Sequence, residues 1–331
     1  MRALFIGGTG NISTAVSRLA LERHWDLYLL NRGRRNVGPD GAHTILGDIT
    51  DPDKIATAIR DQHFDVVVNW IAFKPEDVER DIALFAGKTR QYIFISSASA
   101  YQKPPSYYII TESTPLANPY WNYSQDKIAC ELRLLEEYRR SGFPVTIVRP
   151  SHTYNTIIPV ALGDGYTVVD RLKRGQPVVV HGDGTSLWTL THAEDFAKGF
   201  VGLMGHQLAP GHAFHITSDE VLTWNQIYEA VADAAGVKAQ LVHVSSEFIA
   251  NVADEIGIPT VRGSLLGDKM YSAIFDNSKI KAFVPEYRAT IPLAQGIRKT
   301  LKWFDGDPSR QNIIPKNNEL LDAIIARQRR D

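Results

Sequence analysis

The sequence is poor in cysteine, has no excess of charge of one sign and contains no long apolar run. Cys130 is the single cysteine, so no disulfide can form within the chain. The 36 basic and 37 acidic residues give a net charge of -1, so no overall field draws nucleic acid or an anionic membrane to the protein. The apolar runs are far too short to cross a bilayer. Disulfide scaffolds, strongly basic nucleic-acid binders and membrane-spanning proteins are therefore excluded.

Other absences narrow the architecture and the chemistry. The first apolar segment begins at Arg2 and leaves no space for a charged leader with a separate signal segment, so we expect a cytoplasmic protein. No repeat with a period of about 20 to 50 residues recurs, which argues against a solenoid. None of the ten histidines stands in a cluster with metal-ligand spacing, and we expect no metal site. Cys130 has no cationic setting, so we expect a small buried apolar group rather than a nucleophile.

Short apolar strands alternate with amphipathic helices through the first half of the chain. Continuous β-branched and aliphatic strands separated by helices are typical of a parallel sheet covered on both faces. The pattern predicts an α/β fold with a doubly wound, parallel Rossmann sheet. The expected strands are residues 2–6, 26–30, 43–46, 65–69, 91–96 and 144–148, and the expected helices lie near residues 11–23, 51–61, 75–86 and 121–140.

Turn-rich stretches and shorter elements follow residue 150. We expect residues 1–150 to form the Rossmann domain and residues 151–331 to form mainly a smaller α/β substrate-binding region, with the chain crossing back between the two. Ligands of open α/β sheets bind outside the carboxyl ends of the strands, so the smaller region is expected to close over that edge. Its expected helices lie near residues 193–204, 223–235, 292–304 and 316–329.

A glycine-rich turn, residues 7–10, closes the first expected strand. Gly7 and Gly10 have no side chains, so backbone N–H groups can approach a pyrophosphate, and the N-terminus of the next helix adds positive potential. Ser13 occupies the third position of the usual dinucleotide fingerprint and is small enough to keep helix and sheet close. The turn predicts that the Rossmann domain binds NAD(P), and a tight turn without a ligand is the alternative.

Basic residues follow the second expected strand, where an NAD-selective fold is expected to carry a carboxylate. Guanidinium groups make paired, charged hydrogen bonds to phosphate. We therefore expect NADP rather than NAD, with Arg32 first on the 2'-phosphate and Arg34 or Arg35 as helpers, and a solvated basic loop is the alternative. Further cofactor contacts are expected from the ends of the neighbouring strands: Asn31, Asp48, Ile49, Asn69 and Ala72.

Tyr123 and Lys127 stand four residues apart on an expected helix, 26 residues after Ser97. Residues four apart share one helix face, so the ammonium can lie beside the tyrosine ring. That charge, with the positive charge of an oxidised nicotinamide, is expected to lower the tyrosine pKa well below its usual value of about 10. Tyr123 is then expected to act as general base toward a secondary hydroxyl, or as general acid toward a ketone. Ser97 is expected to hydrogen-bond the same oxygen while Lys127 holds the nicotinamide ribose.

On these residues the chain resembles the short-chain dehydrogenase/reductase superfamily, in its extended branch of NAD(P)-dependent enzymes like nucleotide-sugar epimerases and dehydratases. The likeness covers nearly the whole length and includes residues 95–101, 148–150, 182–185 and 275–279. It implies a small-molecule substrate, a sugar or nucleotide sugar, and a homodimer like those of many relatives. It also implies cofactor contacts from Asn11, Ile12, Ser96 and Pro150 and substrate contacts from Ser99, His152 and Tyr154.

The chain departs from the family pattern at three places. The span from residue 72 to residue 97 is about one helix shorter than in typical members, which puts the usual dimer in doubt. Trp188 occupies the position where nucleotide-sugar enzymes of this pattern carry an arginine for the diphosphate, with Arg262 or Lys269 as possible substitutes. Ala98 and Ser99 occupy the positions where sugar 4,6-dehydratases carry an acidic pair, so dehydration is disfavoured.

Three functions stay open at this point. The first is an NAD(P)-dependent oxidoreductase or epimerase acting on a secondary alcohol or ketone of a sugar or nucleotide sugar. The second is an NADPH-dependent ketoreductase on a non-nucleotide substrate, which the arginine-rich turn and Trp188 favour. The third is a non-catalytic RNA-binding or regulatory relative, against which stand the intact Ser97, Tyr123 and Lys127 and the near-neutral net charge, so no nucleic-acid partner is expected.

Overall fold

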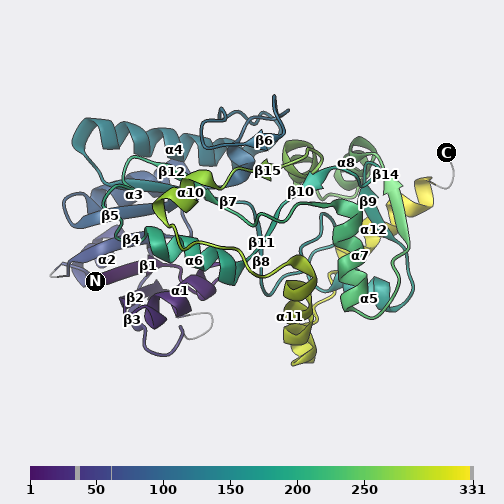
Figure 1. The fold of residues 1–331 in the computed structure, drawn as a ribbon, viewed down its shortest axis with the longest axis horizontal. Helices are drawn as coiled ribbons and strands as arrows, with labels where there is room; N and C mark the ends of the chain where they lie inside the picture. Colours follow the sequence, from purple (N-terminus) through teal and green to yellow (C-terminus); the bar gives the residue numbers. More distant parts are fainter. Residues whose placement is uncertain (34–37, 61, 329–331) are drawn as a thin grey trace.

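The structure is a computed structural model that describes residues 1–33, 38–60 and 62–328. Within this part of the chain, a seven-stranded sheet has the order β12-β7-β5-β4-β1-β2-β3, with every neighbouring pair parallel (Figure 1). This confirms the predicted Rossmann-type α/β fold. The strands are β1 (Arg2–Ile6), β2 (Asp26–Asn31), β3 (His43–Leu46), β4 (Phe64–Asn69), β5 (Thr89–Ile95), β7 (Val145–Pro150) and β12 (Ala213–Ile216).

Helices cover both faces of this sheet because successive strand residues point to opposite faces. Phe5 of β1 packs into the core beneath α1 and α6, whereas Leu4 packs into the core beneath α2, α3 and α4. Cys130 of α4 is fully buried in the second core, and burial raises the pKa of its thiol to about 12, which confirms a buried, protonated cysteine. The helices are α1 (Ser13–Glu22), α2 (Pro52–Ala58), α3 (Pro75–Phe85), α4 (Asn122–Ser141) and α6 (Ala193–Leu203).

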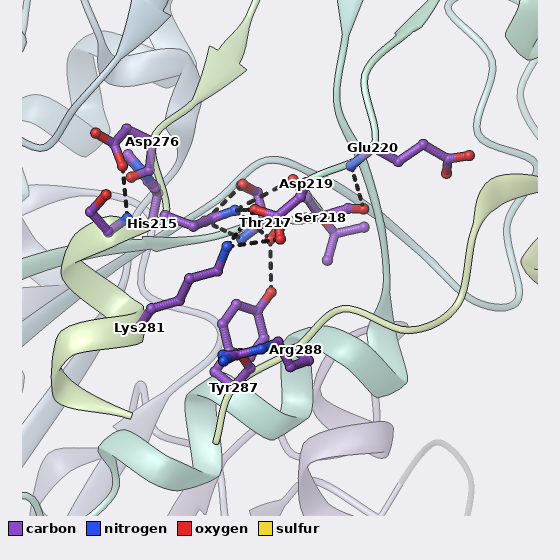
Figure 2. Close-up of polar contacts among 12 residues, drawn as sticks. His215, Thr217, Ser218, Asp219, Glu220, Asp276, Lys281, Tyr287 and Arg288 are labelled. Carbon is purple, nitrogen blue, oxygen red and sulfur yellow. Dashed lines mark hydrogen bonds and ion pairs between the residues drawn. The ribbon is translucent and has the colours of Figure 1, made fainter. Parts of the chain in front are cut away.

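The chain returns to the sheet after residue 150, because β12 pairs with β7 at one edge. Figure 2 shows how the segment after β12 is held by residues 276–288 from near the C-terminus. Thr217 accepts hydrogen bonds at its carbonyl from Asn277 Nδ2 at 2.9 Å and from Tyr287 Oη at 2.8 Å. Lys281 Nζ pairs with Asp219 at 2.8 Å. These contacts join the edge of the sheet to α10 (Ser278–Phe283) and the loop after it.

The remaining C-terminal elements form a second layered region beside the sheet, on the side where α5, α7 and α12 are labelled in Figure 1. Two apolar cores fill it, one around Trp224 and one around Ile324. Its helices are α5 (Thr167–Lys173), α7 (Trp224–Ala234), α8 (Ser246–Glu255), α9 (Thr260–Ser264), the π-helix η2 (Leu265–Lys269), α11 (Leu293–Asp305) and α12 (Pro315–Gln328), with short 3-10 turns η1 (Ala98–Ala100) and η3 (Pro308–Arg310) elsewhere.

Four small two-stranded sheets lie outside the central sheet among the described residues. They pair β6 (Ile109–Ile110) with β15 (Ile274–Phe275), β8 (His152–Tyr154) with β11 (Leu190–His192), β10 (Leu187–Trp188) with β13 (Leu222–Thr223), and β9 (Val178–His181) with β14 (Leu241–Val244). The β6 and β8 pairings bring loops from the carboxyl edge of the central sheet against C-terminal segments. Of the helices described, none has the length and apolar character needed to span a membrane.

Candidate active site

Three cavities follow the carboxyl edge of the central sheet. The outer cavity, about 550 Å³, lies over the ends of β1, β2 and β3, and the middle cavity, about 420 Å³, lies over the ends of β1, β4 and β5. The inner cavity, about 230 Å³, lies between the end of β5, α4 and the C-terminal region. Gly7 and Gly10 line both the outer and the middle cavity, and Ser97 and Tyr123 line both the middle and the inner cavity. Neighbouring cavities therefore share walls.

The turn after β1 has the geometry of an anion cradle. Gly7 has φ +84°, a left-handed conformation, and a Cβ on it would lie 2.7 Å from Cγ2 of Ile71. Ser13 Oγ accepts a hydrogen bond from the Gly10 N–H at 2.7 Å and donates to the Gly7 carbonyl at 3.2 Å, so serine braces the turn. Ile12 caps α1 without a side-chain hydrogen bond, and the N–H groups of Thr14 and Ala15 bond the carbonyls of Gly10 and Ile12, so the middle cavity is bordered by the positive N-terminal end of the helix. These residues fit the pyrophosphate of a dinucleotide.

The side chain of Asn11 makes contacts that its position in the glycine-rich turn does not predict. Its side chain donates from Nδ2 to the Thr153 carbonyl at 3.0 Å and accepts at Oδ1 from the Thr156 N–H at 3.1 Å. Both partners follow β7 in the C-terminal half. Asn11 thus lines the middle cavity, and its side chain ties the glycine turn to the segment after β7.

The basic turn after β2 has a carboxylate beside it in space. Arg32 Nη1 lies 3.8 Å from Asp48 Oδ2, and both side chains are more than a third exposed in the outer cavity. The pair forms because β2 and β3 are parallel neighbours, which brings the ends of both strands to one edge. Asn31 and Ile49 line the same cavity. The two expected helpers on a 2'-phosphate, Arg34 and Arg35, lie outside the described residues.

Two residues expected along the cofactor's ribose lie behind the cavity wall instead. Asn69 is fully buried, donates to the Asp81 carboxylate at 2.5 Å and accepts from the Ile71 N–H at 2.8 Å. Ala72 is buried and accepts a hydrogen bond at its carbonyl from Lys127 Nζ. Neither lines the three cavities, whereas Ile71 does. Direct contact of these two residues with the cofactor stays a prediction. The Asn69 side chain holds the backbone of the turn, and the Ala72 carbonyl holds Lys127.

Lys127 is nearly fully buried behind the tyrosine ring. Its Nζ donates to the carbonyls of Ala72 at 2.7 Å and Ile95 at 2.8 Å, and it lies 5.8 Å from the centre of the Tyr123 ring. Burial lowers the pKa of Lys127 to about 8. The ammonium is therefore fixed between β5, the turn after β4, and α4, on the floor of the middle cavity.

In the protein by itself, the pKa of Tyr123 is shifted upward and not downward. Burial raises the pKa of the Tyr123 phenol, the Ser97 hydroxyl acts in the opposite direction, and the Asp268 carboxylate raises it further. The predicted lowering combined Lys127 with an oxidised nicotinamide, so it stays a prediction for the cofactor-bound protein. In the protein alone Lys127 is engaged with two carbonyls, and burial of the phenol dominates.

Ser97 begins a chain of hydroxyl groups at the end of β5. Its Oγ lies 2.9 Å from Ser99 Oγ, which in turn accepts from Ser124 Oγ at 2.7 Å. Ser99 lines the inner cavity, as expected for a substrate contact, but its hydroxyl is already engaged. Ser96 and Pro150 line the middle cavity, and the buried Ser96 Oγ has no hydrogen-bond partner among the described residues.

Of the expected substrate residues, Ser99, His152 and Trp188 line the inner cavity, and Tyr154 and Arg262 do not. Burial lowers the pKa of His152 to about 3, so the imidazole is neutral. Tyr154 is buried in the apolar core and packs edge-on against His192 at 5.3 Å. Arg262 pairs with Asp254 at 2.6 Å on the surface of the C-terminal region. Contact of Tyr154 and Arg262 with the substrate stays a prediction that these positions do not support, because the Tyr154 ring is packed in the core and the Arg262 guanidinium pairs with Asp254.

Sequence reasoning missed Lys103 and Asp268, which line the far wall of the inner cavity together with Trp121 and Lys269. Lys103 and Asp268 come from segments 165 residues apart, and no motif or spacing connects them. The β6–β15 pairing brings the two segments together. Among the described residues, no group of three or more histidine, cysteine or acidic side chains could hold a metal ion.

Comparison with known proteins gives four informative matches, one to a family profile and three to individual proteins. The profile of the NAD dependent epimerase/dehydratase family matches residues 3–217. The chain is 24% identical over 294 residues to 2'-dehydrokanamycin reductase from Streptomyces kanamyceticus, covering 87% of this chain and 80% of that protein. It is 26% identical over 262 residues to chloroplast stem-loop binding protein of 41 kDa b from Arabidopsis thaliana, covering 73% and 65%. The structure of UDP-glucose 4-epimerase from Bifidobacterium longum with NAD+ and UDP superposes with a TM-score of 0.74 at 19% identity, covering 94% and 100%.

Proposed function

Since the chain belongs to the NAD dependent epimerase/dehydratase family, we propose that it is an NAD(P)-dependent oxidoreductase acting on a secondary alcohol or ketone of a sugar or nucleotide sugar. One observation carries the proposal: Ser97 and Tyr123 line both the middle and the inner cavity. A carbinol carbon in the inner cavity and a nicotinamide in the middle cavity would meet at these two groups.

The chain's own residues define the proton step. Tyr123, whose pKa is raised, is protonated at neutral pH and donates its proton to the oxygen of a ketone. Ser97 hydrogen-bonds the same oxygen and stabilises the negative charge that develops on it. Lys127 and Ser96 border the middle cavity, where they can bind the ribose next to the nicotinamide. The bound nicotinamide supplies or accepts the hydride, and its oxidised form adds a positive charge beside the phenol.

The outer cavity supports a preference for NADP. Arg32 is the basic side chain that lines this cavity at the end of β2, where a 2'-phosphate is bound in Rossmann folds of this kind. Asp48 lies close to the guanidinium and lowers the net positive charge that a phosphate would meet. The proposed preference for NADP over NAD therefore depends on Arg32. A comparison of the affinities for NADPH and NADH tests it.

The inner cavity favours a second candidate, an NADPH-dependent ketoreductase on a non-nucleotide substrate. Its volume of about 230 Å³ lies below the range of about 300 to 1,000 Å³ typical of sites for drug-sized ligands. Trp188 forms part of the wall. The match to 2'-dehydrokanamycin reductase, a protein named as a reductase, supports this candidate. A reductase consumes NADPH, whereas an epimerase turns over without net change in the absorbance of the cofactor.

Two other possibilities stay predictions. Dehydration is disfavoured by Ala98 and Ser99, but the family includes dehydratases, so the argument depends on these two positions alone. The RNA-binding alternative gains support from the chloroplast stem-loop binding protein. Salt-sensitive retention of RNA by the purified chain would favour it.

The experiment that tests the main proposal combines mass spectrometry of the purified protein for retained dinucleotide with a panel of ketones, sugars and sugar nucleotides. Tyr123→Phe is expected to lower kcat by at least about 100-fold while dinucleotide binding stays intact, because it removes the proton donor alone. Tyr138→Phe, on the exposed face of the same helix, serves as the matched control. Wild-type turnover by Tyr123→Phe would refute the assigned chemistry.

A further inference from the structure

Three charged side chains in the inner cavity lack hydrogen-bond partners. Lys103, Asp268 and Lys269 have side chains only 1%, 16% and 15% exposed. Lys103 Nζ lies 4.0 Å from Asp268 Oδ1, and Lys269 Nζ lies 3.9 Å from Asp268 Oδ2, so both ion pairs are longer than a hydrogen bond. No hydrogen bond joins any of these side chains to another described residue. Burial of charged groups without close partners is costly, which points to a ligand that completes their coordination.

The trio is held in place by rigid contacts around it. Asp268 and Lys269 end the π-helix η2, a type of helix that occurs frequently at functional sites. Asn118 Nδ2 donates to the carbonyls of Gly267 at 2.6 Å and Ser99 at 2.7 Å, which fixes η2 against the loop after Ser97. The Lys269 carbonyl accepts from Trp224 Nε1 at 3.1 Å and hydrogen-bonds His181 Nε2 at 2.9 Å. The charged side chains therefore project from a preformed wall.

The charge balance of the cavity selects the ligand. Lys103 and Lys269 face a single carboxylate, Asp268, among the described residues that line it, and His152 is neutral because burial lowers its pKa. With all three groups ionised, the wall carries a net charge of +1. Burial lowers the pKa of Lys103 and raises the pKa of Asp268, so both charges need a close partner to be stable. Two ammonium groups offer six N–H donors in total, more than one carboxylate can accept.

We propose that Lys103 and Lys269 together bind an anionic group of the substrate, a carboxylate or a phosphoryl group, while Asp268 accepts a hydrogen bond from a neighbouring hydroxyl. The identity of this ligand as the substrate rests on the proposed function, but its binding does not. With about 230 Å³ available, a small hydroxylated acid or a sugar phosphate fits better than a large neutral molecule.

Binding, rather than turnover, tests this inference. Calorimetric titration in saturating NADP compares D-glucuronate, D-glucose 6-phosphate, UDP and neutral D-glucose on the wild type. We expect at least one charged probe to bind at least about tenfold more tightly than D-glucose, because charge-assisted hydrogen bonds add affinity. The glucuronate, hexose phosphate and UDP arms separate a carboxylate, a sugar-bound phosphoryl group and a nucleotide diphosphate as the source of the anion.

Variants distinguish ligand binding from a purely structural ion triad. Lys103→Gln and Lys269→Gln are each expected to weaken binding of the charged probe about 10- to 100-fold, whereas Lys269→Arg retains it. Asp268→Asn is expected to strengthen binding of the charged probe several-fold, since it removes the negative charge from the wall. The exposed Lys238→Gln is the control and should bind like the wild type.

Equal affinity of the wild type for charged and neutral probes, or no measurable affinity for any charged probe, overturns the inference. Tighter binding of the charged probe than of D-glucose in both glutamine variants also overturns the inference. If Lys103→Gln does not fold, Lys269→Gln alone keeps the test valid. Tight binding of a charged probe with no oxidoreductase activity on any substrate refutes the proposed function and leaves this site standing. Oxidoreductase activity on neutral substrates alone, with no tighter binding of charged probes than of neutral ones, supports the proposed function and overturns this binding site.

Discussion

Replacing Glu131 with glutamine tests how the helix that carries Tyr123 and Lys127 is held to the sheet. Glu131 stands one turn beyond Lys127 on α4 and is fully buried. Arg149 on β7 donates from Nε to Oε1 at 2.9 Å and from Nη2 to Oε2 at 2.6 Å, and its side chain is only 4% exposed. Arg149 immediately precedes Pro150, which lines the middle and inner cavities. The pair therefore connects the helix to the wall of the site.

The magnitude follows from the burial of both partners. Removing one partner of a buried ion pair costs about 3 to 5 kcal/mol, because the remaining charge is left in a poorly solvated site. At an unfolding entropy of about 2.1 cal/mol/K per residue, the 331-residue chain has a total near 0.7 kcal/mol/K. The midpoint of thermal unfolding should therefore fall by about 4 to 7 °C in Glu131→Gln.

Differential scanning calorimetry measures this shift, with Glu136→Gln as control because Glu136 is exposed on the same helix. The control should change the midpoint by less than about 1 °C, as expected for a surface substitution. The double variant Glu131→Leu with Arg149→Met should lose less stability than Glu131→Gln, since it leaves no unpaired buried charge. A shift in Glu131→Gln no larger than in the control would refute the reasoning.

Three further predictions concern the cofactor side of the site. Gly7→Ala should raise the Kd for dinucleotide at least about tenfold in a fluorescence titration, because a Cβ there meets Ile71, whereas Gly87→Ala, also at positive φ but in open space, should leave the Kd unchanged. Arg32→Gln should weaken NADPH about tenfold and leave NADH within about twofold, and equal losses for both would remove the argument for NADP. Burial lowers the pKa of Lys127 in the folded protein to about 8, below its usual value of 10.5. Between these two values the unfolded chain binds more protons, so the stability of the wild type should rise with pH in this window by up to about 3 kcal/mol. Denaturant titrations of Lys127→Met should lack this rise, and an identical pH dependence in both proteins would contradict a buried, charged Lys127.

Elements with a strong local pattern were predictable from the sequence, and elements defined by distant partners were not. The apolar run of β4 and the helical face of α4 carry their own signals, and both are found where expected. β12 is only four residues long and contains His215, which reads as polar. It is a strand because it pairs with β7, and its buried imidazole bonds Tyr101 Oη at 3.0 Å and the Asp276 carbonyl at 2.6 Å. Neither partner is near it in sequence.

The helix α8 was missed although a local signal exists. Ser245 accepts at its side chain from the Phe248 N–H, which is an ordinary N-cap, and buried apolar residues follow at helical spacing. The N-cap and the spacing of apolar residues over 245–255 are together sufficient to predict this helix. By contrast, the proximity of Arg32 and Asp48 required the order of β2 and β3 in the sheet, which the sequence does not give.

The protonation state of Tyr123 depends on what else is bound, and this follows from how Lys127 is held. Lys127 Nζ bonds two backbone carbonyls, so it cannot move toward the phenol without losing both hydrogen bonds in a buried setting. Burial and Asp268 meanwhile raise the phenol pKa. Charge that favours the phenolate must therefore come from the cofactor when it is oxidised. Without that charge Tyr123 keeps its proton, and the protein's own side chains favour proton donation, which is the direction of ketone reduction.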